Sequence, residues 1–558
     1  MKYSKKMVYS LLGFIVCINI LYRYPSFPHE SGFDSFYMHN LADSISYFGR
    51  AKWVINPLSY LGMYAFSYPS GIPFLFSEVS LVTSVSIEVS ILFAGIMFGI
   101  VGALFAYLVA KEMLDNDIFA FFTSLAFSIS PILLNITTWE GSTKGYVVTL
   151  IPMLIFFIVK HLKTGNTKYL ILALTTLVTL SAIHRIGYIA VFIFLAYLFT
   201  LPIHNITRFA VSPDLAHLKL KRLVVFVSVV GAFGAALALL FFSPGFLGSA
   251  DINTTYSSTT ILHGNSPLIT LANVGISYTG KMGIMLPFMF IGIFALAWRE
   301  RRTPQEKFLI LMTIFLIPFL PMREYMTPFM VSIFAIIIGF SIFYLCNLLR
   351  KRRKTVIAIV LVIIVSSMGF SWTMRDYWKD KYSYNLMTEQ TYNTGIYMKY
   401  TLSKNDMFIA NKGYVSLRIT AVSRIVSLPL GGASGASYNA QQLVYDKNFD
   451  LEIATIYSDI KPVKLDELTY ATNEIFTFND PGRIYDGELS WANILDRGCE
   501  DFGGKLIQDR FNIHYAVETH DLDGKYVFWV MYTSGFLLSV HELRYKIYDN
   551  SEEALWYV

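Results

Sequence analysis

The segment EVSILFAGIMFGIVGALFAYLVA, residues 88–110, carries a single charged residue, which stands at its first position. About 20 mainly apolar residues cross the ~30 Å hydrocarbon core of a bilayer, so this segment is long enough to span a membrane. The residues that follow, KEMLDND (111–117), are strongly charged. Long apolar segments that alternate with short charged connections predict a polytopic helical membrane protein.

The composition of the whole chain agrees with this class. Hydrophobic residues make up 54% of the 558 residues and charged residues only 15%, whereas soluble domains carry roughly 25% charged residues. The net charge of +6 does not indicate a nucleic-acid partner, because the lysines and arginines gather in short runs between apolar segments. The three cysteines, Cys17, Cys346 and Cys499, form no metal-type or disulfide pattern.

About eleven apolar segments are candidate membrane spans. They lie near residues 7–23, 88–110, 117–135, 146–161, 168–184, 186–203, 222–243, 280–298, 307–320, 325–348 and 355–373. We expect the first to be retained as a signal anchor. With a cytoplasmic N-terminus, every strongly basic connection falls on the cytoplasmic side, as the positive-inside rule requires. These connections are KEMLDND, KHLKTGNTK, RFAVSPDLAHLKLKR, WRERRTPQEK and LLRKRRK.

This topology predicts a membrane domain at residues 1–374 and an extracytoplasmic domain at residues 375–558. The membrane domain includes an external loop at 24–87 with interfacial helices. The external domain contains the strand-like runs DMFIAN, EIFTFN and NIHYAVETH, and its last stretch, LRYKIYDNSEEALWYV, alternates around an Asn-Ser turn as a β-hairpin does. The predicted fold is therefore mainly α, with a C-terminal extracytoplasmic α/β domain.

Ionisable side chains inside a membrane are costly and usually functional. The central portions of most predicted spans lack them, and the notable ionisable residues stand at the predicted outer ends of the spans. These residues are Asp34, Glu140, Lys144, His184, Arg185, Arg323 and Glu324. The sequence therefore predicts a functional site at the outer face of the membrane.

Asp34 lies in the stretch SGFDSFYMHNLADSI, residues 31–45, where apolar residues recur with helical spacing. We predict a short interfacial helix with Asp34 in its first turn, where a carboxylate suits the helix dipole. Two interpretations remain open, a simple N-terminal cap and a catalytic group. Asp43 is nine residues further on and lies about 180° round the helix, so the two acids do not form a carboxylate pair.

Glu140 and Lys144 belong to the predicted external connection NITTWEGSTKGY, residues 135–146. Their spacing of four residues also fits a surface ion pair, so both a structural and a functional interpretation stay open.

Three further residues mark the predicted outer rim. His184 and Arg185 occupy the only break in a long apolar run, and Arg323 stands in the tight turn PMREYMTPF, residues 321–329. An arginine at such a break also fits a snorkelling anchor. Two arginines on one rim suit a phosphate, because each guanidinium donates in bidentate fashion.

The order of these features resembles the GT-C class of membrane glycosyltransferases, and in particular archaeal members akin to the protein mannosyltransferases and oligosaccharyltransferases. The stretch FDSFYMHNLADSISYFGRAKW (33–53) is similar to the acidic first-loop motif of that class, and YPSGIPF (68–74) follows it. REYMTPF (323–329) resembles the Arg-Tyr-Pro stretch thought to meet the lipid phosphate. The WWDYG signature of oligosaccharyltransferases is absent, and RDYWKD (375–380) does not replace it.

The resemblance implies an inverting transfer of a sugar from a polyprenyl-phosphate-linked donor to a hydroxyl at the outer face of the membrane. The acceptor is a protein, a lipid or a glycan. Asp34 is the implied general base, and the absence of WWDYG favours transfer of a single sugar over transfer of a whole oligosaccharide to asparagine.

The resemblance also implies how the donor is held. Arg323 is the first candidate for binding the lipid phosphate and Arg185 the second. His184 and Lys144 are supporting candidates. Glu140 is expected to orient the acceptor or to hold a divalent cation, Mg or Mn, and no other cofactor is expected.

Two alternatives belong to other classes of protein. A secondary transporter usually shows internal repeats and polar groups near the membrane midplane, and neither is evident here. A non-enzymatic receptor or assembly protein with an external domain would not need so many charged residues on one rim.

Overall fold

The structure is a computed structural model, and it describes residues 4–49, 71–209, 223–235, 275–276, 278–299, 302–319, 323–381, 386–403, 406–410, 413–429, 513–519 and 545–557. The chain forms two compact units. The helical unit comprises Met1–Pro25, Phe93–Thr138 and Ser142–Lys381. The mixed unit comprises Ser26–Leu92, Trp139–Gly141 and Tyr382–Val558, so it joins the predicted first external loop to the C-terminal region.

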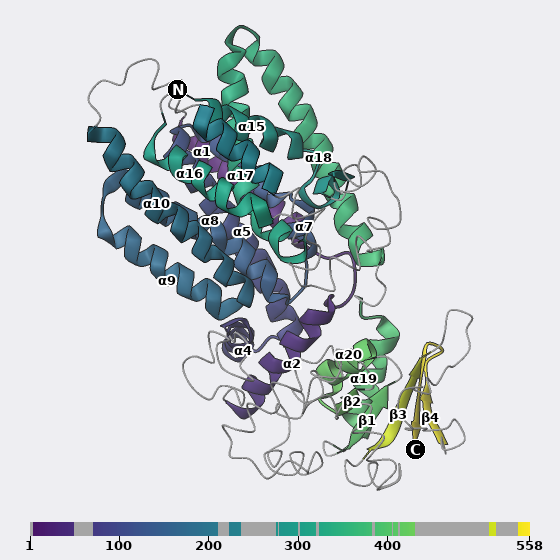
Figure 1. Cartoon of the computed structure of the whole chain (residues 1–558). Coiled ribbons are helices and arrows are strands. Elements are labelled where there is room, and N and C mark those ends of the chain that lie inside the picture. Colours follow the sequence, from purple (N-terminus) through teal and green to yellow (C-terminus); the bar gives the residue numbers. More distant parts are fainter. Residues whose placement is uncertain are drawn as a thin grey trace, which may run out of the picture. The chain divides into compact units, whose positions relative to one another are not determined.

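The helical unit is a bundle of apolar helices (Figure 1). Its helices are α1 (Lys5–Arg23), most of α5 (Ile87–Leu114), α6 (Asp117–Ser128), α7 (Pro131–Asn135), α8 (Thr143–Thr164), α9 (Thr167–Ile183), α10 (Ala190–Phe209), α15 (Leu286–Trp298), α16 (Pro304–Leu316), α17 (Arg323–Leu348) and α18 (Arg353–Lys381), with the short 3-10 turns η1 (Arg185–Ile189), η2 (Ile317–Phe319) and η3 (Arg350–Arg352).

Five of the described helices are long and apolar enough to cross a membrane. They are Lys5–Arg23, Ile87–Leu114, Thr143–Thr164, Met326–Leu348 and Lys354–Tyr377, and six shorter apolar helices accompany them. The predicted class, a multi-pass helical membrane protein, is confirmed. The number of about eleven spans stays a prediction.

Residues 117–135, which the sequence predicts to be one span, form two helices. Helix α6 ends at Ser128 and α7 begins at Pro131. The residue before a proline avoids the helical conformation, and Ser130 is indeed extended, with φ −65° and ψ 122°. Pro131 therefore separates the two helices.

Two of the predicted cytoplasmic connections lie at the same end of the helical unit. The Glu112 carboxylate near the end of α5 accepts hydrogen bonds from Lys160 Nζ at 2.5 Å and Lys163 Nζ at 2.9 Å, both near the end of α8. The connections KEMLDND and KHLKTGNTK are thus neighbours. This is the arrangement that the positive-inside topology requires.

A buried arginine donates hydrogen bonds to the carbonyl groups at the C-terminal end of α1. Arg375 of α18 donates from Nη1 to the carbonyls of Tyr22 and Tyr24, at 3.0 and 3.1 Å. Its guanidinium stacks over the Trp372 ring, and its Nε donates to Asp376 at 2.7 Å. The last carbonyls of a helix lack partners within the helix and attract positive charge, so Arg375 stabilises this end of α1.

The mixed unit contains α2 (Phe33–Phe48), α4 (Gly71–Thr83), α19 (Glu389–Thr401) and α20 (Gly413–Ser423) beside a five-stranded sheet of order β2-β1-β3-β5-β4. The strands are β1 (Met407–Ala410), β2 (Val426–Pro429), β3 (Ile513–Thr519), β4 (Tyr545–Asp549) and β5 (Glu553–Tyr557). β1 pairs in parallel with β2 and β3, whereas β5 pairs antiparallel with β3 and β4.

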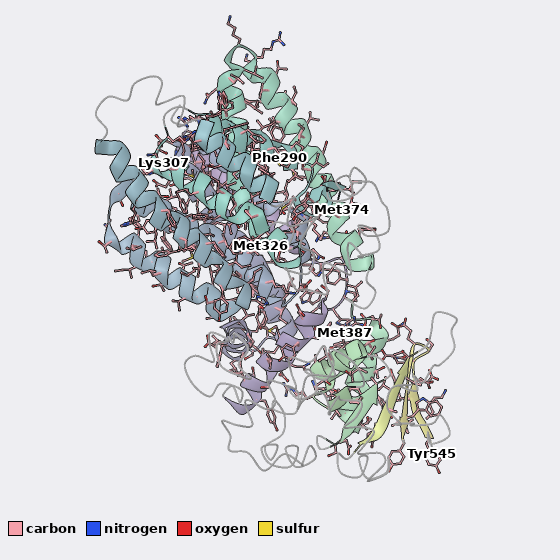
Figure 2. All side chains as sticks on the ribbon, in the orientation of Figure 1. Phe290, Lys307, Met326, Met374, Met387 and Tyr545 are labelled. Atoms are coloured by element: carbon pink, nitrogen blue, oxygen red, sulfur yellow. The ribbon has the colours of Figure 1, made fainter. Side chains whose placement is uncertain are left out.

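Apolar side chains of α19, α20 and the strands form the core of this region, centred on Met398, Phe408, Ile419 and Val517. Figure 2 labels Tyr545, the first residue of β4, which is exposed at the edge of the sheet. The predicted hairpin is confirmed as β4 and β5, and the predicted strands in DMFIAN and NIHYAVETH are β1 and β3. The run EIFTFN (474–479) lies outside the described residues.

The orientation of the chain is testable through its glycosylation sequons. In a glycosylating host we expect modification of Asn253 and Asn135, which the topology places outside, and none of Asn205, which it places inside. The measurement is the gel shift that a glycosidase removes, compared with Asn→Gln variants of each site. A glycan on Asn205 would contradict the predicted orientation.

Candidate active site

Asp34 is the second residue of α2 and is partly exposed. The N-cap position belongs to Gly32, whose φ of +93° suits glycine and which has no side chain to cap the first turn. Asp34 is therefore not the N-cap residue itself, and its functional role stays a prediction. Its carboxylate lies in the first turn of the helix.

The segment Trp139–Gly141 lies against the N-terminus of α2. Ser31 N donates to the Trp139 carbonyl at 2.9 Å, and Gly141 N donates to Ser35 Oγ at 2.6 Å. Trp139 has a φ of +45°, an uncommon conformation for a residue with a side chain. These contacts attach the loop that carries Glu140 to the turn that carries Asp34.

The side chain of Glu140 lies directly against Gly32. A Cβ atom at Gly32 would come within 2.7 Å of Glu140 Cδ and 3.0 Å of its Oε1, and the φ of +93° at this position favours glycine. Two acids far apart in the sequence, Asp34 and Glu140, are thus brought to the N-terminus of the same helix. Asp34 and Glu140 are the two predicted site residues that belong to the mixed unit.

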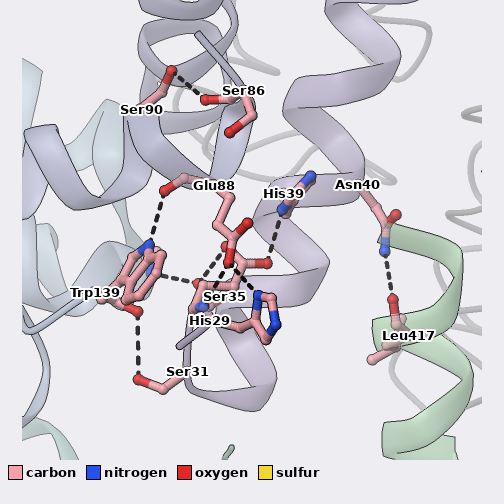
Figure 3. Close-up of polar contacts among 12 residues, drawn as sticks. His29, Ser31, Ser35, His39, Asn40, Ser86, Glu88, Ser90, Trp139 and Leu417 are labelled. Carbon is pink, nitrogen blue, oxygen red and sulfur yellow. Dashed lines mark hydrogen bonds and ion pairs between the residues drawn. The ribbon is translucent and has the colours of Figure 1, made fainter. Parts of the chain in front are cut away.

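The same unit holds two carboxylate–histidine pairs, and Figure 3 labels His29, His39 and Glu88 among their members. His39 Nδ1 is 2.8 Å from Glu30 Oε1, and His29 Nδ1 is 3.2 Å from Glu88 Oε1. Glu30 N also donates to Glu88 Oε1 at 3.0 Å, so the two pairs are linked. His29 stacks on the Tyr392 ring, with a centroid separation of 4.1 Å.

Sequence reasoning did not single out these four residues. His29 and Glu30 are adjacent in PHESG, directly before α2, which is a local signal that was available. Glu88 gave no such signal, because it appears in the sequence as the first residue of an apolar span. Its role depends on a hydrogen bond from the backbone N–H of Glu30, which lies 58 positions earlier in the chain.

The carboxylates of this cluster raise the pKa of its two histidines. Burial by itself lowers the pKa of His39, but the charge and hydrogen bond of Glu30 raise the pKa above the ordinary value of 6.5. Burial likewise lowers the pKa of His29, and Glu88, helped by Glu389, raises it above that value. Both imidazoles therefore keep their proton to a higher pH in the folded protein than a free imidazole does.

This preference predicts a stability that falls as the pH rises. A raised pKa means that the folded state binds more protons than the unfolded state, so the stabilisation is complete below pH 6.5 and is lost above it. We expect the thermal unfolding midpoint of the mixed unit to fall between about pH 6 and about pH 9.

The measurement is thermal unfolding of the purified protein across this range. The double variant His29→Gln/His39→Gln should show a flatter pH dependence. His161→Gln, which changes a histidine near the end of α8 in the helical unit, is the control and should behave as the unchanged protein does. A midpoint that rises with pH would contradict the assignment.

The remaining predicted residues belong to the helical unit. Lys144 is the second residue of α8, Arg185 begins η1 and Arg323 begins α17. The side chains of both arginines lie outside the described part of the structure. Because α17 starts at Arg323, this arginine accompanies the free amide groups of a helix N-terminus, which attract anions.

His184 has a local structural role. It is buried at the end of α9, and its Nδ1 accepts a hydrogen bond from Ile186 N at 2.9 Å. Its carbonyl accepts from Gly187 N at 2.8 Å. The predicted break in the apolar run is therefore real, and His184 caps the first turn of η1.

Arg23 is a buried charge that the sequence analysis did not single out. Its Nε donates to Thr137 Oγ1 at 3.0 Å and its Nη1 to Asn19 Oδ1 at 2.6 Å, and both partners are neutral. Gly99 of α5 leaves the space for the guanidinium, since a Cβ there would overlap it. These contacts hold α1 against α5 and the residues that follow α7.

The predicted divalent cation needs several ligands of the right type. Asp34 and Glu140 supply two carboxylates, but the described residues contain no group of three or more His, Cys, Asp and Glu side chains that would hold a metal ion. The described residues alone do not fit a metal site.

No protein-family model and no curated protein matches the sequence. Solved structures do match the fold. An oligosaccharyltransferase from Archaeoglobus fulgidus, in complex with Zn and sulfate, has a TM-score of 0.55 at 15% identity, with 91% of this chain and 67% of that chain covered. The A. fulgidus oligosaccharyltransferase AglB, in complex with an inhibitory peptide and a dolichol-phosphate, has a TM-score of 0.54 at 13% identity over 96% of this chain and 75% of that one.

A third match comes from a different kind of protein. ArnT from Cupriavidus metallidurans, bound to undecaprenyl phosphate, has a TM-score of 0.53 at 10% identity, with 99% of this chain and 98% of that chain covered. These matches identify the fold as that of the GT-C membrane glycosyltransferases, as the sequence resemblance predicted. At such low identity they establish the fold, and the activity needs its own argument.

Proposed function

We propose that this protein is a membrane glycosyltransferase that moves a single sugar from a polyprenyl-phosphate-linked donor to an acceptor hydroxyl at the outer face of the membrane. The observation that carries the proposal is the position of two acids at the N-terminus of α2, Asp34 in its first turn and Glu140 against Gly32, in a chain with the GT-C fold. The solved relatives bind dolichol-phosphate and undecaprenyl phosphate, which supports a lipid-phosphate carrier.

The proposed reaction is a displacement with inversion at the anomeric carbon. The acceptor oxygen forms a bond to this carbon while the bond from the carbon to the phosphate oxygen breaks, and the polyprenyl phosphate leaves with the electron pair. Asp34 takes the acceptor proton as the general base. A carboxylate in the first turn of α2, partly exposed, is accessible to an acceptor.

The negative charge that develops on the leaving phosphate needs fixed positive donors. We assign this role first to Arg323 and second to Arg185, with Lys144 and His184 as supports. The start of α17 at Arg323 supports the assignment, because helix N-terminal amides and a guanidinium both donate to phosphate oxygens.

Glu140 has the proposed role of orienting the acceptor. Its side chain is held against the backbone of Gly32, at the same helix end as Asp34. Glu140 is not assigned a divalent cation, because the described residues contain no group of ligands that would hold one. Glu140 binds the acceptor, and Asp34 accepts the acceptor's proton.

The test is an assay of the purified protein in lipid nanodiscs with a panel of sugars linked to polyprenyl phosphate. Release of free polyprenyl phosphate together with a glycosylated hydroxyl acceptor is the expected result. Folded protein that releases no polyprenyl phosphate from any donor would contradict the proposal. Release without any sugar on the acceptor would point to hydrolysis instead.

A further inference from the structure

One face of α2 packs on α20. Phe36, Asn40 and Asp43 recur at spacings of four and three residues, so they share this face. Phe36 is buried in a cluster with Met387, Leu417 and Ala421. Asn40 Nδ2 donates to the Leu417 carbonyl at 3.3 Å, as Figure 3 shows.

A bidentate ion pair, between Asp43 of α2 and the residue that follows α20, completes this contact. Arg424 Nε donates to Asp43 Oδ2, and Arg424 Nη2 donates to Asp43 Oδ1, both at 2.6 Å. Asp43 is only 4% exposed. Paired donation of this kind fixes direction as well as distance, because both planar groups must be aligned.

Arg424 has an unusual backbone for an arginine. It follows α20 with a φ of +62°, and its N–H donates to the Thr420 carbonyl at 2.8 Å. At this left-handed position after a helix, glycine or asparagine is the usual residue, because a Cβ is disfavoured there. The arginine is explained by its side chain, which reaches Asp43.

The geometry connects this pair to the proposed general base. Asp34 and Asp43 are nine residues apart on one continuous helix, so they lie on opposite faces about 180° apart. A rigid helix held on one face presents its other face in a fixed direction. Any rotation or tilt of α2 that the loss of the pair allows therefore moves Asp34.

We infer that Asp43 and Arg424 are positioning residues for the transfer reaction: through them, α20 of the C-terminal region fixes α2 and so orients Asp34. This inference rests on the proposed function. A displacement of about 1 Å in a reacting group costs as much as 10²-fold in rate. The chemical step should therefore depend on Arg424 even though Arg424 does not touch the substrate.

The key variant is Arg424→Gly. Glycine is the preferred residue for this backbone, which offsets part of the cost of leaving the buried Asp43 carboxylate without its Arg424 partner. The unfolding midpoint should therefore fall by several degrees, while the protein stays folded at the assay temperature. We expect kcat to fall by about 10- to 100-fold with little change in KM for the lipid donor. Arg424→Lys, which keeps the charge without the bidentate fork, should recover part of the loss.

A double-mutant cycle separates positioning from other effects. If Arg424 acts through Asp34, Arg424→Gly should cost almost nothing in the Asp34→Asn background, because there is no base left to orient. Lys546→Ala, which breaks an exposed ion pair with Asp549 in the same unit, is the control and should keep full kcat.

Failures of the two proposals are distinguishable. Full kcat in Arg424→Gly, or an equal loss in the Asp34→Asn background, would overturn the positioning role and leave the base assignment intact. Normal turnover in Asp34→Asn would overturn both. If kcat falls only because the unfolding midpoint drops so far that less of the protein is folded in the assay, Arg424 is a structural residue.

Discussion

Asp34→Asn is expected to lower turnover by roughly two to four orders of magnitude, which is the usual contribution of general-base catalysis. Asparagine preserves the size of the side chain and tolerates the first turn of α2, but it cannot accept a proton from the acceptor hydroxyl. Donor binding and the unfolding midpoint should change little. The measurement is the release of polyprenyl phosphate under saturating donor, together with donor affinity and thermal unfolding.

The control for this experiment has to be chosen from the structure. Asp43→Asn is unsuitable, because Asp43 is engaged by Arg424. Glu78→Gln changes an exposed carboxylate on α4 of the same unit and should keep full turnover. Near-normal turnover in Asp34→Asn would remove Asp34 from the chemistry and make Glu140 the next candidate for the base.

Arg323→Ala is expected to lower kcat by roughly 10²- to 10³-fold, the loss seen when one preorganised donor to a developing negative charge is removed. Arg323→Lys should restore the activity only in part, because an ammonium group cannot donate two parallel hydrogen bonds to a phosphate. The measurement is kcat and KM with a single lipid donor for both variants.

Arg352→Ala is the matched control for Arg323. Arg352 is an exposed arginine of η3, in a connection that the topology assigns to the cytoplasmic side. It should leave kcat unchanged. Full rescue by Arg323→Lys would indicate that only positive charge is needed, and unchanged kcat in both variants would exclude Arg323 from phosphate binding.

The class of protein follows from the sequence because its signals are local. An apolar run such as residues 88–110 predicts a membrane helix by its length alone, and the structure has α5 there. The hairpin at β4 and β5 and the helix at α2 are likewise encoded in short patterns of alternating or helical spacing. The break at His184 was predictable for the same reason.

The candidate site was only partly predictable. Asp34 and Glu140 stand out as acids at the ends of predicted spans, but nothing local indicates that Glu140 lies against Gly32. That contact depends on a glycine with a φ of +93° and on the approach of the segment 139–141. The sequence placed Asp43 on the helix face opposite Asp34 and indicated no partner for it, whereas the structure pairs it with Arg424.

The sequence by itself determined that this chain is a polytopic membrane protein with acids and arginines at the predicted outer ends of its helices, because hydrophobicity and charge act over neighbouring residues. Tertiary structure decided which of those groups meet. The contacts of Glu30 with Glu88, of Ser35 with Gly141 and of Asp43 with Arg424 join residues 58, 106 and 381 positions apart. Such contacts form only when distant segments pack together, and no local pattern specifies their partners.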